Sequence, residues 1–428
     1  MSILSNLYTG TSGLSAHGDA IGVVGDNIAN VSTVGFKSSR AGFSDILGGV
    51  TARGQRVGVG VQLGAVQSRF GQGSIQQTGG PLDMAVRGDG FFVLQGDNAG
   101  VPGQYFSRDG RFSLNEEGFV TNPNGLRLQG YTIAPDGTQN SSLGDLELGA
   151  GQNPPLPTSD VSMVLNLNGT DTAPPAFDPA DPNNTSNFAT SMTVYDSLGT
   201  ERRVDMYFRT SGSGAWEWHA MVDGEDVTGG TPGTPVEAAT GTLQFDANGA
   251  LDVETPGAAT IDFQGAAAGQ SLAFDFGDAI TTDAGTGLTG TTQFSGPSSV
   301  SSLNQDGYGF GDLVDISVSD DGTMQGVFSN GQRRAIARVA LADFTSEDGL
   351  ARAGGALFTE TPDSGQALID GAAVGGRGAI TSGALEMSNV DLATELVTMI
   401  SYQRAFSANV KTVTTADEML AEVSSLKR

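Results

Sequence analysis

The clearest pattern in the chain is a heptad repeat of apolar residues near its carboxyl end. From Ser388 to Arg428 they recur at alternating steps of four and three, the spacing that places side chains along one face of a helix in a coiled coil. A helix over Asn389 to Leu426 is roughly 55 Å long, longer than a compact domain needs for its last element. The seam consists of Leu392, Leu396, Met399, Gln403, Phe406, Val410, Val413, Asp417 and Leu420.

Local signals at both ends agree with this helix. Asn389 is the expected N-cap, because its side chain can accept a hydrogen bond from the first free backbone N–H groups. Asp391 and Glu395 then lie near the positive end of the helix dipole, and Lys427 and Arg428 near its negative end. The pattern therefore predicts one long helix that packs against other helices.

A second seam with the same spacing lies in residues 1–31, but glycines interrupt it. Each glycine costs about 1 kcal/mol relative to alanine in a helix interior, so we expect this segment to be mostly disordered alone and to fold when packed against neighbours. The alternative is a helical hairpin within one compact domain. The seam is Ile3, Leu7, Gly10, Leu14, His17, Ile21, Val24 and Ile28, and the glycines are Gly10, Gly13, Gly18, Gly22 and Gly25.

After the first helix, residues 33–37 predict a turn in which Gly35 takes a positive φ. The chain up to Arg69 is rich in glycine and reads as an extended connector. Alternation of Val57, Val59, Val61 and Leu63 with glycine and glutamine predicts one short strand there.

The sequence predicts short strands separated by turns in residues 73–150, and the same pattern recurs in 301–375. Asx-Gly pairs suit the type I′ turns that match strand twist, so both stretches predict an antiparallel β domain built from the two flanks. The turns are expected at Gly88-Asp89-Gly90, Asp109-Gly110, Glu117-Gly118, Asn124-Gly125 and Asp136-Gly137.

Residues 151–300 predict a further β domain inserted into the first, after a proline-rich linker. Its strands are expected at Met192 to Tyr195, Val204 to Phe208, Trp216 to Val222 and Leu243 to Phe245. The predicted fold is multidomain α+β, with a terminal α-helical coiled-coil layer and nested, mainly antiparallel β domains. The expected parts are 1–34 with 384–428 as a helical assembly domain, 35–72 with 376–383 as a connector, 73–150 with 301–375, and 151–300.

Composition narrows the possible partners. A net charge of -27 and a pI near 4.1 argue against nucleic acid and anionic membrane, because those partners need basic patches. There is no run of eighteen apolar residues, and no Lys or Arg precedes Lys37 to form a secretory n-region. We therefore expect no membrane insertion, and export, if it occurs, without a cleaved signal peptide. Zero cysteines exclude disulfides and thiolate sites.

The search for catalytic, cofactor and metal sites finds none. His17 on the helical seam reads as a packed residue rather than a ligand, and His219, on the opposite face of a strand from Trp218, reads as exposed. Asp246-Ala247-Asn248-Gly249 has its glycine too early for an EF-hand loop and reads as a turn. Gly58, Gly60 and Gly64 do not complete a dinucleotide fingerprint. A carboxylate pair for glycoside hydrolysis is not visible from spacing.

Several motifs together resemble the bacterial flagellar rod and hook axial proteins. The first spans Asn27 to Lys37, the second Gly73 to Phe92, the third Phe106 to Gly110 and the last Gly383 to Arg404. The resemblance covers about the first 130 and last 60 residues. The residues that carry it are Asn27, Asn30, Thr33, Gly35, Phe36, Lys37, Pro81, Leu82, Asp83, Gly90, Phe91, Phe92, Asn389, Asp391, Leu392, Gln403 and Arg404.

The resemblance implies a structural subunit, not an enzyme, that self-assembles into the tubular, flexible hook between rod and filament, outside the cell. The inserted domain and the length favour a hook member of the family over the short rod members. Implied partners are copies of itself, the rod and hook–filament junction proteins, the hook cap and the flagellar export apparatus. A distal rod or hook-associated junction protein is the alternative; a secreted adhesin or a polysaccharide-active enzyme would not need matched helical seams.

Overall fold

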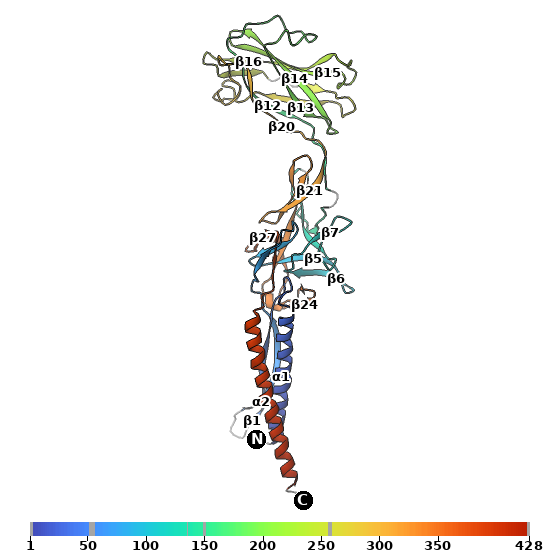
Figure 1. Cartoon of the computed structure of the whole chain (residues 1–428), viewed down its shortest axis with the longest axis vertical. Helices are drawn as coiled ribbons and strands as arrows, with labels where there is room; N and C mark the ends of the chain where they lie inside the picture. The colour runs from blue at the N-terminus through green and yellow to red at the C-terminus, as the bar shows by residue number, and fades with distance from the viewer. Residues whose placement is uncertain (1–2, 51–55, 135, 149–150, 256–258, 426–428) are drawn as a thin grey trace. The chain divides into compact units, whose positions relative to one another are not determined.

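The computed structural model describes residues 3–50, 56–134, 136–148, 151–255 and 259–425 (Figure 1). The chain forms two compact units, which are described separately. Unit 1 contains Met1–Gly151, Val314–Val327 and Arg333–Arg428, and unit 2 contains Gln152–Leu313 and Phe328–Gln332. Unit 1 is therefore built from both ends of the chain.

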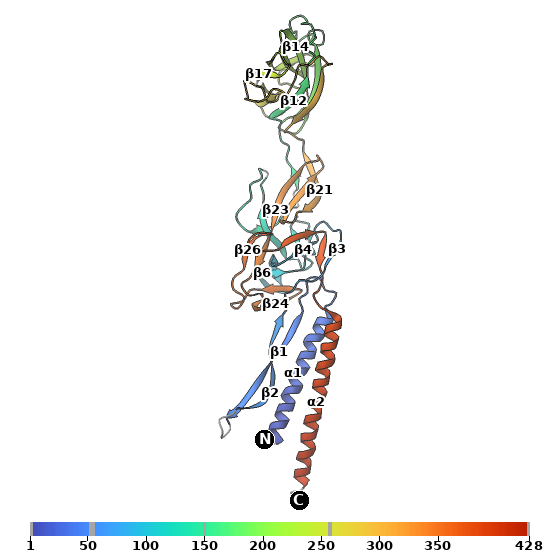
Figure 2. The ribbon, with the colours of Figure 1, turned by 90° about the vertical axis from the view of Figure 1, so that its left-hand side faces the viewer.

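Two long helices, α1 (Ile3–Ala29) and α2 (Leu392–Ser425), lie side by side and antiparallel in unit 1 (Figures 1 and 2). Glycines of α1 allow the close approach. A Cβ added at Gly10 would lie 2.7 Å from Val413 Cγ2, and one added at Gly13 would lie 2.7 Å from the Asn409 side chain. At Gly22 an added Cβ would meet no described atom within 4 Å, so that glycine has no packing reason within the chain.

The expected N-cap of α2 is wrong. The helix begins at Leu392, and the Asp391 carboxylate accepts hydrogen bonds from the backbone N–H groups of Ala393 and Thr394, at 2.9 and 3.2 Å. These bonds hold the pKa of the Asp391 carboxyl below its ordinary value. Asn389 lies two residues before Asp391, and its side chain bonds to other segments, as described below.

A long antiparallel hairpin runs beside α1 (Figure 2). It consists of β1 (Ser39–Val50) and β2 (Arg56–Ser68), paired from Ser39 with Ser68 to Val50 with Arg56. The Ser12 hydroxyl on α1 accepts a hydrogen bond from the Val61 N–H, at 3.2 Å. The sequence predicted one short strand here; β1 was missed because its apolar residues do not alternate regularly, and its register shifts at several points.

The largest sheet of unit 1 combines strands from both flanks, in the order β22-β23-β9-β5-β6-β25-β24. Its core contains edge-to-face pairs of Phe91, Phe106, Phe344 and Phe358. Two small sheets, β27–β4 and β28–β3, also join the flanks. The bounds are β3 Ile75–Gln77, β4 Met84–Arg87, β5 Phe91–Asn98, β6 Val101–Ser107, β7 Ser113–Leu114, β8 Val120–Thr121, β9 Arg127–Thr132, β10 Gly144–Asp145, β22 Thr323–Phe328, β23 Arg333–Asp343, β24 Ala351–Gly354, β25 Leu357–Thr359, β26 Leu368–Gly371, β27 Ala379–Ser382 and β28 Ala384–Glu386, with a 3-10 turn at Glu347–Gly349.

Two of the expected hairpin turns are wrong. Gly88-Asp89-Gly90 connects β4 to β5, but β4 pairs with β27, and β5 pairs with β6, β9 and β23. Asp109-Gly110 follows β6, but the next strand, β7, pairs with β8 and not with β6. The Gly110 carbonyl instead accepts a hydrogen bond from the Met84 N–H, at 2.9 Å, and Asp109 is buried. The motif that contains this pair therefore crosses the interior of unit 1 rather than turning at its surface.

Unit 2 contains a five-stranded antiparallel sheet, β13-β14-β15-β16-β17, and a four-stranded sheet, β18-β19-β12-β20. Among the described strands of these two sheets, pairing is antiparallel except between β12 and β19. A single core joins the sheets, with Trp216 and Trp218 fully buried. Strand β21 (Gly311–Val318) leads out of unit 2. The bounds are β11 Gln152–Asn153, β12 Asp160–Asn166, β13 Phe188–Tyr195, β14 Glu201–Gly212, β15 Ala215–Asp223, β16 Pro235–Phe245, β17 Leu251–Thr255, β18 Ala259–Ile261, β19 Gln270–Asp275 and β20 Ser299–Gln305.

His219 is not exposed as expected. It faces away from Trp218, but the Phe177 ring stacks on it with ring centroids 3.7 Å apart. The His219 Nδ1 also lies 2.5 Å from the Glu237 carboxylate. The long proline-containing loop that carries Phe177 thus covers the outer face of this strand, which sequence alternation does not reveal.

Candidate assembly site

The apolar seam of α2 only partly overlaps the face that packs on α1, with Val413 belonging to both. Tyr402, Asn409 and Val413 lie against α1, and Ala416 is buried. At about 100° per residue, the seam lies roughly a quarter of a turn away from this row. The large apolar side chains left exposed on α2 are Leu392, Leu396, Val397, Ile400, Phe406, Val410 and Met419, whereas Met399, Val413 and Leu420 of the seam are half-buried.

On α1 the fully buried row is made mostly of small residues, while the predicted seam is mostly half-buried. His17 packs against Phe43 and Tyr402, with ring centroids 5.1 and 6.0 Å away, which fits a packed histidine. The side chain of Ile3 lies outside the described residues. The buried row is Gly10, Gly13, Ala16, Ala20, Val24 and Asn27, and the half-buried seam residues are Leu7, Leu14, Ile21 and Ile28.

A buried charge cluster joins the two ends of the chain where the helices meet the β strands. The Glu386 carboxylate on β28 accepts a hydrogen bond from Lys37 Nζ at 2.7 Å and another from Arg108 Nη1 at 3.3 Å. The Gly73 N–H donates to the same carboxylate at 2.7 Å. Burial lowers the pKa of the Lys37 ammonium, and the Glu386 charge opposes that shift. Two cations around one carboxylate make this cluster an electrostatic tie between distant segments.

Two asparagines tie the backbone around this cluster. Asn27 of α1 exchanges two hydrogen bonds with the Ser39 backbone, donating to the carbonyl at 2.7 Å and accepting from the N–H at 2.8 Å. Asn389 accepts from the Ser38 N–H at 2.7 Å. The Asn389 amide also donates to the carbonyls of Arg69 and Gly71, at 2.7 and 2.9 Å. These bonds connect the end of α1, both ends of the β1–β2 hairpin and the start of α2.

Gly35 is required by both conformation and space. Its φ is +67°, as the sequence predicted, and its N–H donates to the Glu386 carbonyl at 2.8 Å. An added Cβ would lie 2.6 Å from the Arg108 carbonyl carbon. A side chain there would therefore push the third motif away from the end of α1.

The remaining motif residues divide into packed and exposed groups. Phe91 and Phe92 are fully buried, and Gly90 has a φ of +113°. The Asp83 carbonyl accepts a hydrogen bond from the Gly383 N–H at 2.8 Å, so the Pro81-Leu82-Asp83 turn also contacts the carboxyl-terminal flank. Gln403 and Arg404, by contrast, lie exposed on α2.

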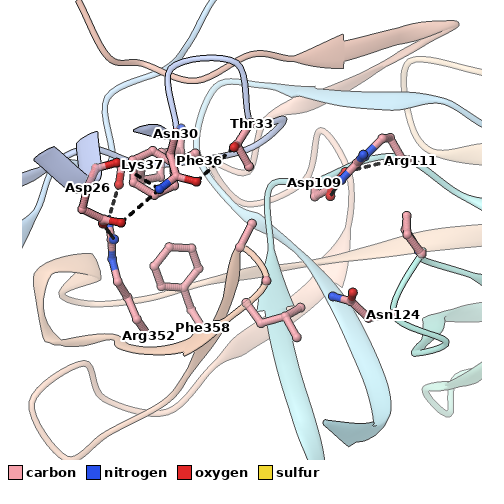
Figure 3. A pocket seen from close by; sticks show the side chains of 15 residues that line it. Asp26, Asn30, Thr33, Phe36, Lys37, Asp109, Arg111, Asn124, Arg352 and Phe358 are labelled. Atoms are coloured by element: carbon pink, nitrogen blue, oxygen red, sulfur yellow. Dashed lines mark hydrogen bonds and ion pairs between the residues drawn. The ribbon is translucent and has the colours of Figure 1, made fainter. Parts of the chain in front are cut away.

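A pocket of ≈ 360 Å³ lies beside the cluster, at the end of α1 (Figure 3). Asn30 donates to the Asp26 carboxylate at 3.0 Å, and Thr33 donates to the Asn30 side-chain oxygen at 3.0 Å. Arg352 stacks over Phe36, 5.0 Å from the ring centroid, and also donates to the Lys37 carbonyl. The polar groups at the rim thus already partner one another.

The described residues contain no group of three or more His, Cys, Asp or Glu side chains placed to hold a metal ion. Asp246 forms a turn, since its carboxylate accepts from the N–H groups of Asn248 and Ala250. Within the described ranges, no helix is both long and apolar enough to cross a membrane.

Sequence reasoning quoted Glu386 and Arg108 within motifs but assigned neither a role. One signal was available: Glu386 ends the apolar Ala384-Leu385 pair, and Lys37 directly follows Gly35-Phe36. A charge within an apolar segment is buried only with a partner. The pairing itself was not readable, because 349 positions separate Lys37 from Glu386.

Models of four families match successive parts of the chain. Residues 7–37 match the model described as flagella basal body rod protein, and 85–146 match the flagellar hook protein FlgE/F/G D1 domain. Residues 166–308 match the flagellar basal body protein FlaE D2 domain, and 381–426 match the flagellar basal body rod FlgEFG protein C-terminal model. The matches follow the nested order of the two units.

Similar proteins extend over nearly the whole chain. The flagellar hook protein FlgE of Escherichia coli K12 is 34% identical over 421 residues, which cover 97% of this chain and 98% of that protein. FlgE of Borreliella burgdorferi is 33% identical over 456 residues, covering 99% and 100%. A crystal structure of Helicobacter pylori flagellar hook protein FlgE2 shares the fold, with a TM-score of 0.50 and 17% identity over 73% of this chain and 100% of that chain. This chain therefore belongs to the flagellar hook protein FlgE family.

Proposed function

We propose that this protein is the structural subunit that polymerises into the flagellar hook, the flexible extracellular tube that transmits torque from rod to filament. The observation that carries the proposal is the exposed apolar seam of α2. Leu396 is 45% exposed and Phe406 is 37% exposed, although both lie on a 34-residue helix that already has a partner helix. Contiguous apolar surface of this kind is typical of a surface that another molecule covers.

The cover for this seam is a helix of a neighbouring subunit. Fully burying a leucine or phenylalanine side chain contributes about 1.5–3 kcal/mol, so a seam of several such residues supplies the association energy. The exposed Gly22 face of α1 leaves room for a close neighbour. In the polymer the terminal helices line the inside of the tube as a shared coiled-coil layer, and the β domains form its outer shells.

The cluster around Glu386 supports separate roles for the terminal helices and the β domains in this tube. Because Lys37, Arg108 and Glu386 join the helices to the β strands within one subunit, force on the inner layer reaches the outer domains. The proposed parts are 1–34 with 384–428 for assembly, 35–72 with 376–383 as connector, 73–150 with 301–375, and 151–300 as the outer domain. Discrete domains can tilt while the inner layer stays joined, which is what bending during rotation requires.

The proposed partners are copies of the same chain along the tube, and rod and hook–filament junction proteins at its two ends. The hook cap and the flagellar export apparatus are proposed as transient partners. The family relationship supports these proposals.

The test is assembly of a seam variant. Leu396→Asp with Phe406→Asp places two carboxylates on the seam, and we expect tube formation by concentrated protein to be abolished while both β units stay folded. Electron microscopy measures the tubes and circular dichroism the fold. Ser407→Asp, one residue from Phe406 and exposed on the same helix, is the control that should still form tubes. Normal tubes from the double variant would contradict the proposal.

A further inference from the structure

Strand β20 ends the four-stranded sheet of unit 2 and has β12 as its single strand neighbour among the described residues (Figure 1). The pairing contains a bulge. Val164 pairs with Ser302, but the next residue of β12, Leu165, pairs with Val300, so Ser301 is an extra residue. Bulges at sheet edges redirect side chains.

The bulge places two apolar side chains on one face. Leu303 is opposite Met163, and Val300 is opposite Leu165. Residues directly opposite in an antiparallel pair point to the same side of the sheet, and Met163 and Leu165 point into the core. Without the bulge, a spacing of three would put Val300 and Leu303 on opposite faces. The core face therefore continues onto the edge, where Val300 is 40% and Leu303 36% exposed.

The edge is also free of charge in a strongly acidic unit. Residues 152–313 contain 21 Asp and Glu but only three Arg and no Lys, whereas residues 284–305 carry no charged side chain. Exposed edge strands are usually protected from pairing by charges, by proline or by a bulge. Strand β20, Ser-Val-Ser-Ser-Leu-Asn-Gln, has the bulge but no charge and no proline.

We propose that the β20 edge is a contact between subunits, covered by the outer β unit of a second copy of this chain; this rests on the proposed polymerisation. Two copies of a unit this acidic repel each other. A contact that placed carboxylates in the interface would also remove their solvation, which costs free energy. A second copy can bind to an apolar edge that carries no charge without the repulsion and without the desolvation cost. In a helical tube the contact is head-to-tail, so β20 meets a different surface of its neighbour.

The first test adds one charge to the edge. Leu303→Glu is compared with Leu198→Glu, the same substitution at a loop leucine that is 65% exposed. We expect Leu303→Glu to raise the critical concentration for tube formation about tenfold, and the rise to shrink in high salt because screening weakens like-charge repulsion. Leu198→Glu should change it less than twofold. Equal critical concentrations for the two variants would overturn the proposal.

The second test does not depend on the stability of a charged variant. A photo-crosslinking residue, Ser301→p-benzoylphenylalanine, should give covalent dimers in illuminated tubes and none in dilute monomer, with the same residue at Leu198 as control. Tubes without crosslinks at position 301 would overturn the β20 contact but leave polymerisation intact. Failure of the unmodified protein to form tubes would instead overturn the proposed function.

Discussion

The carboxylate of Glu386 joins three segments of unit 1 that are far apart in the chain. It is fully buried, and it compensates two cations that are themselves almost fully buried. Removing one member of such a group leaves a charge without a partner in a medium that solvates it poorly. The cluster therefore fixes how the helices leave the β strands.

Glu386→Gln should destabilise unit 1 by about 3 kcal/mol, because Lys37 and Arg108 would share a neutral amide. Urea unfolding measures the change. The control is Glu117→Gln. Glu117 pairs with Arg127 and has a largely exposed side chain, so its substitution should lower the free energy of unfolding by under about 1 kcal/mol. Equal effects of the two substitutions would show that the buried cluster contributes little.

Sequence reasoning succeeds for a residue when the reason is local. The positive φ of Gly35 was predicted because a turn had to follow the helix. Sequence reasoning failed for Asn389. Its side chain is suitable for a cap, but it forms three hydrogen bonds with backbone groups of distant segments, and Asp391 is the cap instead. Both residues are good caps, so only the tertiary contacts decide between them.

At the scale of elements, the glycines of α1 have two different explanations. Gly10 and Gly13 lie where α2 touches α1, whereas Gly22 faces open space within the subunit. A glycine lowers the stability of a helix in the free chain, and at Gly22 no close contact with another segment explains why a glycine is present. We therefore expect free subunits to gain helical order when they pack together.

Gly22→Ala should raise the helix content of the monomer, since alanine stabilises a helix interior by about 1 kcal/mol relative to glycine. Gly10→Ala should not, because its Cβ would overlap Val413, and overpacking costs about 1–3 kcal/mol. Circular dichroism at 222 nm compares the two variants. A larger helix content in Gly10→Ala than in Gly22→Ala would contradict this account of the helix contact.

Both helices were predictable, because a heptad spacing maintained over several turns has few other interpretations. The face on which they meet was not. Within the chain, α2 presents Tyr402, Asn409 and Val413 to α1, the last two directly beside Gly13 and Gly10. Much of the apolar seam that was readable from sequence remains exposed, whereas Met399, Val413 and Leu420 are half-buried.

At the scale of the whole molecule, unit 2 has its own core and contains a buried carboxyl whose pKa lies well above its ordinary value. Glu254 on β17 is largely buried and accepts a hydrogen bond from the Phe276 N–H at 3.2 Å. Burial, with the nearby Asp275 and Asp283 carboxylates, raises its pKa from 4.5 to about 7. The folded state of unit 2 thus holds a proton that the unfolded chain releases more readily.

The unfolding free energy of unit 2 should therefore fall as pH rises from about 4.5 to about 7 and be flat above that range. Glu254→Gln should remove this dependence and stabilise unit 2 at pH 8 by roughly 2 kcal/mol, a discounted value for incomplete burial. Calorimetry at pH 5 and pH 8 resolves the effect. A change in the unfolding of unit 1 caused by Glu254→Gln would argue against two independent units.

The joining of Lys37 to Glu386 also sets an order of events. The partners are 349 positions apart, and all of unit 2 lies between them. Contacts across so long a loop form late, because loop-closure entropy must be overcome first. Unit 2 can fold from a nearly continuous segment, but the joint between helices and strands closes only when the carboxyl-terminal flank is available. A chain interrupted before Glu386 leaves Lys37 and Arg108 without their counter-charge and does not offer a finished subunit to a growing tube.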